Sequence, residues 1–420
     1  MARRVWFLLV ALAAAAAGCV SSGEVEVGDP VGEAPVLSST INSSTSTTTE
    51  VTTTTTEAIT TTEAPDPILL LLETMTVEQR AGQLLMPVLF GTDAEVVSSA
   101  EAAANQRLAA VDSIAAAIQT YNLGGILYLG NNINGADQLS ALSAGIQAAA
   151  RDVIPGVGAL IAVDQEGGRV NRITDGVEVF PSARALSGDA DAVQAAAEAT
   201  GAGLAAQGIN VVLAPVADLT SGNSGVIGNR SYSDDPEVAA EMVAAAVSGL
   251  QSSGVAAGVK HWPGHGATTL DSHSQLPVIN VDDETWRGRE RVPFAAAVES
   301  GVAIVMVGHL ALPLLDPEGR PATVSPVLVD ELLRGDLGFE GVVMTDALDM
   351  GAVRDQDRAG LVVDSMLAGV DVLLATPDVA VAHAAIVDAV KSGTISEDAL
   401  DDAVERVLRL KARLGLLDLS

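Results

Sequence analysis

The stretch that decides the fold is VAAGVKHWPGHG, at residues 255–266. Its first five residues are apolar and continuous, as expected for a parallel strand that is buried on both faces. At Lys260 the pattern changes to charged and aromatic residues, and Pro263 with its neighbouring glycines excludes a regular helix. A buried strand that ends in a polar loop predicts a functional site at the carboxyl end of a sheet.

The same order of apolar run and polar end recurs from Pro67 onward. The expected strands are Gln83–Phe90, Gly125–Leu129, Ala159–Val163, Asn210–Pro215, Val255–Lys260, Ala303–Val307, Gly341–Thr345 and Asp371–Ala375. Helix-like stretches lie between them, at Ala136–Arg151, Asp191–Gln207, Pro236–Ser252 and Trp286–Ser300. This alternation predicts an α/β fold, a (β/α)8 TIM barrel that forms a single catalytic domain over residues 67–420. A doubly wound open sheet has the same order of elements and stays open as the alternative topology.

Composition narrows the class of partner. The chain has 420 residues, of which 48% are hydrophobic, which suffices for a large buried core. It carries 22 Lys and Arg against 54 Asp and Glu, a formal net charge of −32. Because phosphate binding needs a basic face, nucleic acid is not expected as a partner. Cys19 is the only cysteine, so the sequence excludes an internal disulfide framework and a zinc cluster built on cysteines.

The first 18 residues have the pattern of a signal peptide. Arg3 and Arg4 precede the apolar run Val5–Ala17, which is shorter than the roughly 20 residues that a spanning helix needs. The run ends at Gly18 and Cys19, which resembles a bacterial lipoprotein signal. That resemblance implies lipidation of Cys19 and a location on the extracellular face of the cell membrane. An ordinary signal peptide of a secreted protein, with an incidental cysteine, is the alternative.

Residues 19–66 are expected to form a disordered linker. The segment from Ser38 to Ala64 consists mainly of Thr, and it has almost no large apolar side chains. Such a sequence cannot bury enough surface to offset the entropy of ordering. It therefore predicts a flexible tether, open to O-glycosylation, between the membrane anchor and the globular domain.

Polar residues gather where the predicted strands end. They are Asp164, Arg172, Asp218, Lys260, His261, Asp271, His273, His309 and Asp346. Asp346 directly follows an apolar run, so its carboxylate is held rigidly, as a nucleophile that attacks a sugar anomeric carbon requires. The structural alternative for an Asp at such a turn is to cap the helix that follows. Asp349 fits that role better than Asp346 does.

The loop after the fifth predicted strand holds a second group of reactive side chains. Asp271 next to His273 can fix the imidazole tautomer and favour its protonated form, so that His273 acts as a general acid and base. The charged donors Lys260, Arg172 and Arg230 can hold sugar hydroxyls or a carboxylate. Asp164 can accept hydrogen bonds from a pair of hydroxyls.

Three other types of site fit these residues less well. His261, His265 and His273 with Asp271 are candidate zinc ligands, but they lack the helical i, i+4 pair of a metallohydrolase. The glycines around His265 are not followed by the Gly-Lys-Ser/Thr of a phosphate-binding loop. The chain also lacks the Gly-x-Ser-x-Gly turn of an α/β-hydrolase.

Taken together, these motifs resemble glycoside hydrolase family 3, and more narrowly its bacterial β-N-acetylglucosaminidase branch. The resemblance covers about Thr74 to Leu417. It rests on KHWPGHG at 260–266 with DSH at 271–273 and on TDALDM at 345–350, and DQEGGR at 164–169 and NRS at 229–231 add to it.

The resemblance implies a TIM barrel and retaining hydrolysis through a glycosyl-enzyme intermediate. It implies Asp346 as nucleophile and the Asp271–His273 pair as acid/base on a mobile loop. It also implies that a set of side chains holds the N-acetylglucosamine ring at the non-reducing end, namely Asp164, Arg172, Arg230, Lys260 and His261. His309 matches the family pattern less closely, and Trp262 stands where the family often has Phe.

The sequence thus predicts an exo-β-N-acetylglucosaminidase that acts on peptidoglycan fragments or chitin-type oligosaccharides. The alternatives are a family 3 β-glucosidase or β-xylosidase, a phosphorylase in which phosphate replaces water, and a catalytically silent sugar-binding lipoprotein. The proposed chemistry needs no cofactor and no metal. A small carbohydrate and, through the anchor, the membrane are the expected partners of a monomer.

Overall fold

The computed structural model describes residues 66–220 and 225–418. Its strands are β1 (Leu85–Met86), β2 (Gly125–Tyr128), β3 (Leu160–Val163), β4 (Gln165–Gly167), β5 (Val170–Asn171), β6 (Val211–Val212), β7 (Ala256–Trp262), β8 (Ile304–Val307), β9 (Val342–Thr345) and β10 (Leu373–Leu374). Each of the eight predicted runs contains or overlaps one of them. The short antiparallel pair β4–β5 was not predicted.

The central sheet is parallel and has six strands in the order β2-β3-β6-β7-β8-β9. Gly125 lies opposite Leu160 where β2 pairs with β3, and Ile304 lies opposite Val342 where β8 pairs with β9. Every residue of β2, β3, β7, β8 and β9 is buried, as continuous apolar runs predict for strands covered on both faces. Each fully buried Val or Ile in this layer contributes about 1.5–3 kcal/mol relative to an exposed one.

Both edges of the six-stranded sheet are linked by hydrogen bonds to the segments of a separate strand pair, β1 and β10. β1 pairs with β10 in parallel, with Leu85 opposite Leu373. On one side, Leu127 of β2 donates to the carbonyl of Pro87 (3.0 Å). On the other side, Thr345 of β9 donates to the carbonyl of Val372 (2.9 Å).

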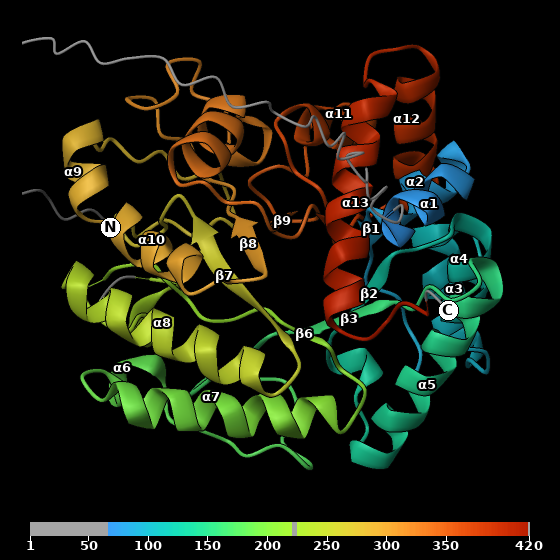
Figure 1. Ribbon diagram of the computed structural model, residues 1–420, viewed down its shortest axis with the longest axis horizontal. Helices are drawn as coiled ribbons and strands as arrows, with labels where there is room; N and C mark the ends of the chain where they lie inside the picture. Colours follow the sequence, from blue (N-terminus) through green and yellow to red (C-terminus); the bar gives the residue numbers. More distant parts are fainter. Residues whose placement is uncertain (1–65, 221–224, 419–420) are drawn as a thin grey trace, which may run out of the picture. The chain divides into compact units, whose positions relative to one another are not determined.

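Helices surround the strands (Figure 1). They are α1 (Pro67–Thr74), α2 (Val77–Gln83), α3 (Ser99–Ala109), α4 (Ile114–Tyr121), α5 (Ala136–Val153), α6 (Ala183–Leu186), α7 (Ala190–Ala205), α8 (Pro236–Ser252), α9 (Asp283–Gly288), α10 (Arg291–Glu299), α11 (Arg358–Leu367), α12 (Val379–Lys391) and α13 (Glu397–Arg413). Shorter or irregular turns are η1 (Gly130–Asn132), η2 (Gly228–Arg230), η3 (Ala322–Val324) and the π-type η4 (Val327–Asp336). Helix α7 packs against α8, and α8 packs against α10.

Local sequence explains where the helices begin. Asp235 accepts hydrogen bonds from the backbone N–H groups of Glu237 and Val238, and Pro236 occupies the first turn of α8. The prediction of one helix over Trp286–Ser300 was wrong in detail. The chain forms α9 and α10 instead, because Arg289 has a non-helical backbone with ψ of −82°.

The first helix, α1, begins directly after Asp66. Asp66, predicted as the last linker residue, caps α1 through the N–H of Ile68 (2.9 Å). Its other oxygen lies 2.6 Å from Nη2 of Arg409 on α13. The signal peptide, Cys19 and the rest of the predicted linker lie outside the described residues. Within the described ranges, no helix is both long and apolar enough to cross a membrane.

Candidate active site

The polar residues predicted to converge do lie around one cavity at the carboxyl ends of the parallel strands. The cavity measures about 660 Å³, within the usual range of about 300–1,000 Å³ for small-molecule sites. It is lined by eight of the predicted site residues, namely Asp164, Arg172, Arg230, Lys260, His261, Asp271, His273 and Asp346, and by Glu166 and Asp349 in addition. Of the polar set named from the sequence, Asp218 and His309 lie behind this lining.

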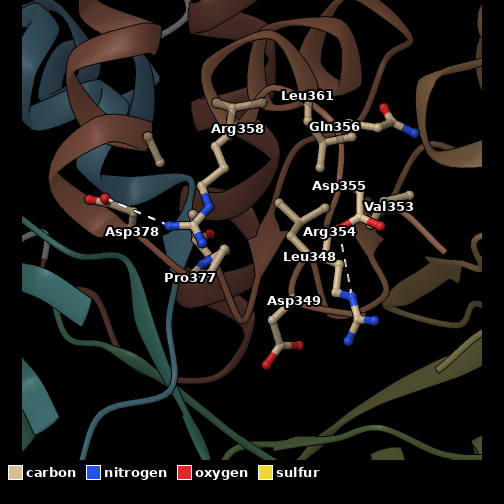
Figure 2. Close-up of a pocket in the computed structure, with 13 residues that line it drawn as sticks. Leu348, Asp349, Val353, Arg354, Asp355, Gln356, Arg358, Leu361, Pro377 and Asp378 are labelled. Carbon is tan, nitrogen blue, oxygen red and sulfur yellow. Dashed lines mark ion pairs between the residues drawn. The ribbon is translucent and has the colours of Figure 1, made fainter. Parts of the chain in front are cut away.

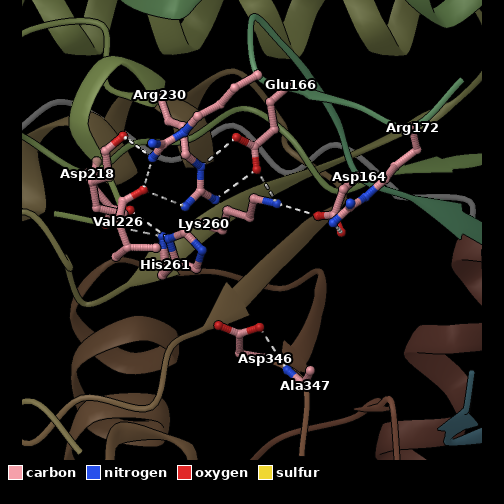
Figure 3. A network of polar contacts seen from close by, with 12 residues as sticks. Asp164, Glu166, Arg172, Asp218, Val226, Arg230, Lys260, His261, Asp346 and Ala347 are labelled. Atoms are coloured by element: carbon pink, nitrogen blue, oxygen red, sulfur yellow. Dashed lines mark hydrogen bonds and ion pairs between the residues drawn. The ribbon is translucent and has the colours of Figure 1, made fainter. Parts of the chain in front are cut away.

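A cluster of buried charges forms one wall of the cavity (Figure 3). Nζ of Lys260 lies 2.7 Å from Oδ1 of Asp164 and 2.7 Å from Oε1 of Glu166. Glu166 also accepts from Nε and Nη2 of Arg230, at 2.7 and 2.8 Å. The cations predicted to hold substrate therefore also hold two carboxylates of the protein, which fixes the position of every member.

The charge pairing determines the protonation states in this wall. Burial alone would raise the pKa of Glu166, but Lys260 and Arg230 bring it down to about 2. Burial alone would lower the pKa of Lys260, but Asp164 and Glu166 raise it above its ordinary value. At neutral pH the wall therefore consists of ionised groups in fixed positions. Arg172 is more loosely placed, since its side chain is 45% exposed and its Nη2 lies 3.8 Å from Oδ2 of Asp164.

His261 is oriented by a buried carboxylate behind it. Its Nδ1 lies 2.6 Å from Oδ2 of Asp218, and the other oxygen of Asp218 accepts from the backbone N–H groups of His261 and His265. Burial raises the pKa of Asp218, but His261 and His265 together bring it below its ordinary value. An ionised Asp218 makes Nδ1 of His261 the donor, and Nε2 has no hydrogen-bond partner among residues 66–220 and 225–418.

Asp346 lies immediately after β9 and borders the cavity. Its backbone N–H donates to the carbonyl of Val307 (2.9 Å), and its Oδ1 accepts from the N–H of Ala347 (2.8 Å). Burial raises the pKa of Asp346, but nearby His261 and the Ala347 hydrogen bond contribute to an overall lowering. The result is an ionised, rigidly held carboxylate, as a nucleophile requires.

Asp271 and His273 form the predicted pair on the loop after β7. Nδ1 of His273 lies 2.7 Å from Oδ1 of Asp271, which also accepts from the backbone N–H of His273 (2.9 Å). Both side chains are exposed, 63% for His273 and 44% for Asp271. Burial raises the pKa of Asp271, but the hydrogen bonds from His273 contribute to an overall lowering. Because the ionised Asp271 holds Nδ1, Nε2 of His273 is left to exchange a proton at the cavity.

The loop that carries Asp271 and His273 is joined to the segment that follows Asp346. Gly351 donates its N–H to the carbonyl of His273 (2.9 Å), and Ala352 donates to the carbonyl of Ser272 (3.1 Å). These bonds link the loop after β7 to the loop after β9. The two reactive groups therefore face one cavity from loops that are connected to each other.

One assignment from the sequence needs correction. Asp349 caps no helix, because α11 starts only at Arg358 with Asp357 as its cap. Instead, Asp349 borders the cavity, where burial and then the neighbouring charge of Asp346 contribute to a raised pKa. Trp262 is fully buried and packs edge-on against Trp286, so it belongs to the core and not to the site.

His309 supports the site from beneath and is buried. Its Nδ1 lies 2.6 Å from the hydroxyl of Thr323, and its Nε2 lies 2.9 Å from the carbonyl of Ala347. Burial lowers the pKa of His309, so it is neutral, with Nε2 as donor and Nδ1 as acceptor. Nε2 thus holds the turn that carries Asp346, while Thr323 fixes the orientation of the ring through Nδ1.

Glu166 was missed as an individual site residue, although its motif was noticed. The histidines weighed as an alternative zinc site have other partners: Nε2 of His265 lies 3.1 Å from the hydroxyl of Ser272, and Nδ1 of His261 lies 2.6 Å from Asp218. In the part of the chain that the structure describes, no group of three His, Cys, Asp or Glu side chains is placed to hold a metal ion.

The arrangement can perform nucleophilic substitution on a polar ligand, with proton transfer by an acid/base group. An ionised carboxylate and an imidazole with one free nitrogen face a cavity whose wall offers fixed donors and acceptors for hydroxyl groups. These are the parts that cleavage of a glycosidic bond through a covalent intermediate requires.

Comparison with known proteins identifies relatives of this domain. Residues 76–410 match the model of the glycosyl hydrolase family 3 N terminal domain. The chain is 36% identical to the β-hexosaminidase of Stenotrophomonas maltophilia (strain K279a) over 304 residues, which cover 70% of this chain and 84% of that protein. It is 32% identical to β-hexosaminidase A of Pseudoalteromonas piscicida over 71% of its own length, but it spans only 54% of that protein.

A solved structure shows the same relationship. A glycoside hydrolase family 3 β-N-acetylglucosaminidase from Paenibacillus sp. str. FPU-7 superposes with a TM-score of 0.75 at 38% identity. The match covers 81% of this chain and 63% of that one.

Proposed function

The chain belongs to glycosyl hydrolase family 3, and we propose that it is a retaining exo-β-N-acetylglucosaminidase, in the class of β-N-acetylhexosaminidases. It removes terminal non-reducing N-acetylglucosamine from peptidoglycan fragments or chitin-type oligosaccharides. The names of its relatives support this activity. The observation that carries it is that Asp346 and the Asp271–His273 pair line one cavity.

In the first step, a carboxylate oxygen of Asp346 attacks the anomeric carbon and the bond from that carbon to the leaving oxygen breaks. His273 gives the proton on its Nε2 to the leaving oxygen, so the leaving sugar departs as a neutral alcohol. The products of this step are the free alcohol and a glycosyl ester of Asp346.

In the second step, a water molecule loses a proton to Nε2 of His273 as its oxygen bonds to the anomeric carbon. The bond between that carbon and Asp346 breaks, which restores both the carboxylate and the protonated imidazole. Two successive inversions retain the β configuration. Ionised Asp271 stabilises the imidazolium form of His273, which is present before the first step and is restored by the second.

The charged wall binds the sugar ring. In this role Asp164 accepts from hydroxyl groups, while Lys260, Arg230 and Arg172 donate. His261, held at Nδ1 by Asp218, presents its Nε2 to the ring. The pairing of Lys260 and Arg230 with Asp164 and Glu166 places these donors before substrate arrives, which lowers the entropy cost of binding.

The proposed scaffold is a closed eight-stranded (β/α)8 barrel. The pairing of β1 with β10 supports closure, as do the hydrogen bonds from Leu127 to Pro87 and from Thr345 to Val372 at the two margins of the six-stranded sheet. In a closed barrel the carboxyl ends of all strands face one mouth, where loops from different strands can meet. Asp164, His261 and Asp346, which follow or end different strands, border one cavity in this way.

A membrane location remains part of the proposal. Cys19, at the end of the predicted signal peptide, would carry the lipid, and residues 20–65 would connect the membrane to the domain. Partition of the full chain into detergent, compared with Cys19→Ser, tests this. Retention of the variant in the detergent phase contradicts lipidation at Cys19.

One assay separates the activities that family 3 allows. The full chain is incubated with p-nitrophenyl β-N-acetylglucosaminide, β-glucoside and β-xyloside, each with and without phosphate. Release from the N-acetyl substrate alone, at a rate that phosphate does not change, is the expected result. A preference for the plain glucoside contradicts the proposed substrate, and acceleration by phosphate favours the phosphorylase.

A further inference from the structure

Ser272 lies between the two members of the acid/base pair, but it is buried where they are exposed. The side chains of Asp271 and His273 are 44% and 63% exposed, whereas Ser272 is 2% exposed. The Asp-Ser-His triplet belongs to the motif on which the family resemblance rests. The proposed reaction uses its first and third members and leaves the buried hydroxyl in the middle without a role.

The partner of this hydroxyl is a buried histidine from the same loop. Oγ of Ser272 lies 3.1 Å from Nε2 of His265. His265 is 1% exposed, and its Nδ1 has no hydrogen-bond partner in the described part of the chain. Among these residues the ring therefore makes a single hydrogen bond, which goes to the middle of the triplet.

His265 itself is held firmly at the end of β7. Its backbone N–H donates to Oδ1 of Asp218 (2.6 Å), the carboxylate that also orients His261. The next residue, Gly266, passes very close to the segment after β6, since a Cβ atom there would lie 1.6 Å from the carbonyl oxygen of Leu219. A buried ring on so tightly packed a backbone is a fixed point for the group that it binds.

The backbone of the triplet is also bound to the segment after β9, which is less tightly packed. The carbonyls of Ser272 and His273 accept hydrogen bonds from Ala352 and Gly351. The next residue, Val353, lines a cavity of about 290 Å³ between this segment and the start of α12 (Figure 2). A segment that borders a cavity makes fewer packing contacts on that side. The bond to His265 is therefore the firmer of the two attachments.

Asp271 and His273 can move as one unit, because their own hydrogen bonds of 2.7 and 2.9 Å hold them together. Loss of the bond to His265 would leave this pair intact but would free its position relative to Asp346. Attack by Asp346 on the bound sugar does not depend on that position. Proton donation does, because Nε2 of His273 must lie within hydrogen-bond distance of the leaving oxygen.

We propose that Ser272 and His265 are positioning residues that hold the acid/base pair at the cavity. Neither side chain lines the cavity, so neither contacts the substrate in this role. The hydroxyl fixes the backbone between Asp271 and His273 to the end of β7. The inference rests on the proposed function and adds two residues to its mechanism.

The test compares Ser272→Ala with the wild type on two substrates that differ in leaving group. The N-acetylglucosamine dimer needs a proton on its leaving oxygen, whereas 2,4-dinitrophenyl β-N-acetylglucosaminide does not. In the full chain we expect kcat/KM for the dimer to fall about tenfold, within the range for loss of one hydrogen bond. For the dinitrophenyl substrate both kcat and KM should keep their wild-type values.

A second comparison asks whether Ser272 acts through His265. His265→Leu removes the partner and should give the same selective loss for the dimer. Adding Ser272→Ala to His265→Leu should then cause no further loss, because the bond is already absent. If Ser272→Ala does not fold, Ser272→Cys gives the same comparison, since a thiol fills the space but bonds only weakly.

Ser143→Ala is the matched control. Ser143 is also 2% exposed and its hydroxyl lies 3.1 Å from that of Tyr128, but neither residue lines the cavity. This variant should keep wild-type kcat/KM for both substrates.

Three results would overturn the positioning role of Ser272. They are an unchanged rate for the dimer in Ser272→Ala, an equal loss for both substrates, and a further loss when Ser272→Ala is added to His265→Leu. The proposed function is tested separately by hydrolysis of p-nitrophenyl β-N-acetylglucosaminide by the wild type. Absence of that activity contradicts the function, whereas its presence without the selective loss contradicts only the role of Ser272.

Discussion

Glu166 and Arg230 form a double hydrogen bond, with Nε and Nη2 of the guanidinium at 2.7 and 2.8 Å from the two carboxylate oxygens. Both side chains are at least 90% buried. The same carboxylate lies 2.7 Å from Nζ of Lys260. Glu166 thus joins two of the cations assigned to the sugar, although it was not singled out as a site residue from the sequence.

Glu166→Gln should weaken both substrate binding and stability. The neutral amide leaves two buried cations with less compensating charge, and breaking a buried ion pair costs about 3–5 kcal/mol. We expect KM for p-nitrophenyl β-N-acetylglucosaminide to rise at least about tenfold and the melting temperature to fall. Steady-state kinetics and thermal unfolding measure these two effects.

Glu405→Gln is the control for this variant. Glu405 pairs with Arg409 one helical turn away on α13, and both side chains are partly exposed. Such pairs contribute less than about 1 kcal/mol, so this variant should change neither KM nor the melting temperature measurably. An unchanged KM in Glu166→Gln shows that the buried cluster does not position the sugar-binding groups.

Asp346→Asn should abolish nearly all turnover, whereas Asp349→Asn should retain much of it. Asp346 is ionised and held by the N–H of Ala347, while Asp349 has a raised pKa. Loss of the nucleophile should reduce kcat by more than about 10³-fold, or about 4 kcal/mol of activation free energy. Added azide should restore part of the activity of Asp346→Gly, because a small anion can take the place of the carboxylate.

The opposite ranking of these two variants would assign the nucleophile to Asp349. The configuration of the azide product gives an independent check. An α-glycosyl azide indicates a single inversion at the anomeric carbon, as the role of Asp346 in a two-step retaining reaction demands.

The strands and their polar ends could be predicted because parallel strands covered on both faces have a simple pattern. The runs that became β2, β3, β8 and β9 are apolar throughout and all buried. Once the carboxyl ends share one edge, Asp164, His261 and Asp346 must lie near one another. The pairing of Asp271 with His273 could also be predicted, since the two are separated by a single residue.

The role of Glu166 depends on a short hairpin that no periodic pattern reveals. β4 and β5 pair antiparallel with Gln165 opposite Asn171, and the turn needs Gly167 and Gly168 at φ of +87° and +60°. The two adjacent glycines were the available signal for a sharp turn after Glu166. Asp349 was misassigned because an Asp at a strand end resembles a helix cap, whereas here a run of turns separates it from α11.

His273→Ala should slow hydrolysis most where the leaving group is a poor one. Proton donation matters little for a nitrophenolate, which is stable as an anion, but greatly for a sugar alkoxide. We expect kcat/KM to fall about 10²- to 10⁴-fold for the N-acetylglucosamine dimer and much less for 2,4-dinitrophenyl β-N-acetylglucosaminide. Asp271→Asn should give the same trend with a smaller amplitude, because the imidazole remains.

His383→Ala serves as the control for removal of an imidazole. His383 lies on α12 and its Nε2 donates to the carbonyl of Glu78, away from the cavity. Its loss should leave the dependence on leaving group unchanged. An equal loss for good and poor leaving groups in His273→Ala means that this residue does not act as the general acid.

Lys411→Met should stabilise the domain, and more so at pH 6.5 than at pH 9.5. Lys411 is fully buried on α13, where it continues the apolar stripe of Val404, Val407 and Leu408. Its Nζ donates a hydrogen bond to Oε1 of Gln83 (2.6 Å). Burial lowers the pKa of Lys411 to about 7, from about 10.4 in an unfolded chain. Between these pH values the unfolded state therefore binds more protons than the folded state. As a result, the free energy of unfolding of the wild type increases as the pH rises from 7 toward 10.

At pH 6.5 the buried ammonium is charged and destabilises the folded state most. Met should then raise the free energy of unfolding by about 1–4 kcal/mol, as replacement of buried charges by apolar groups often does. Denaturant unfolding of variant and wild type at each pH gives the difference between their free energies of unfolding. The contributions of the other titrating groups cancel in this difference.

Lys391→Met is the control, because it removes a 58% exposed lysine paired with Glu78. Its difference from the wild type should not depend on pH in this way. A difference for Lys411→Met that stays constant from pH 6.5 to 9.5 would mean that Lys411 does not titrate in the folded domain within this range.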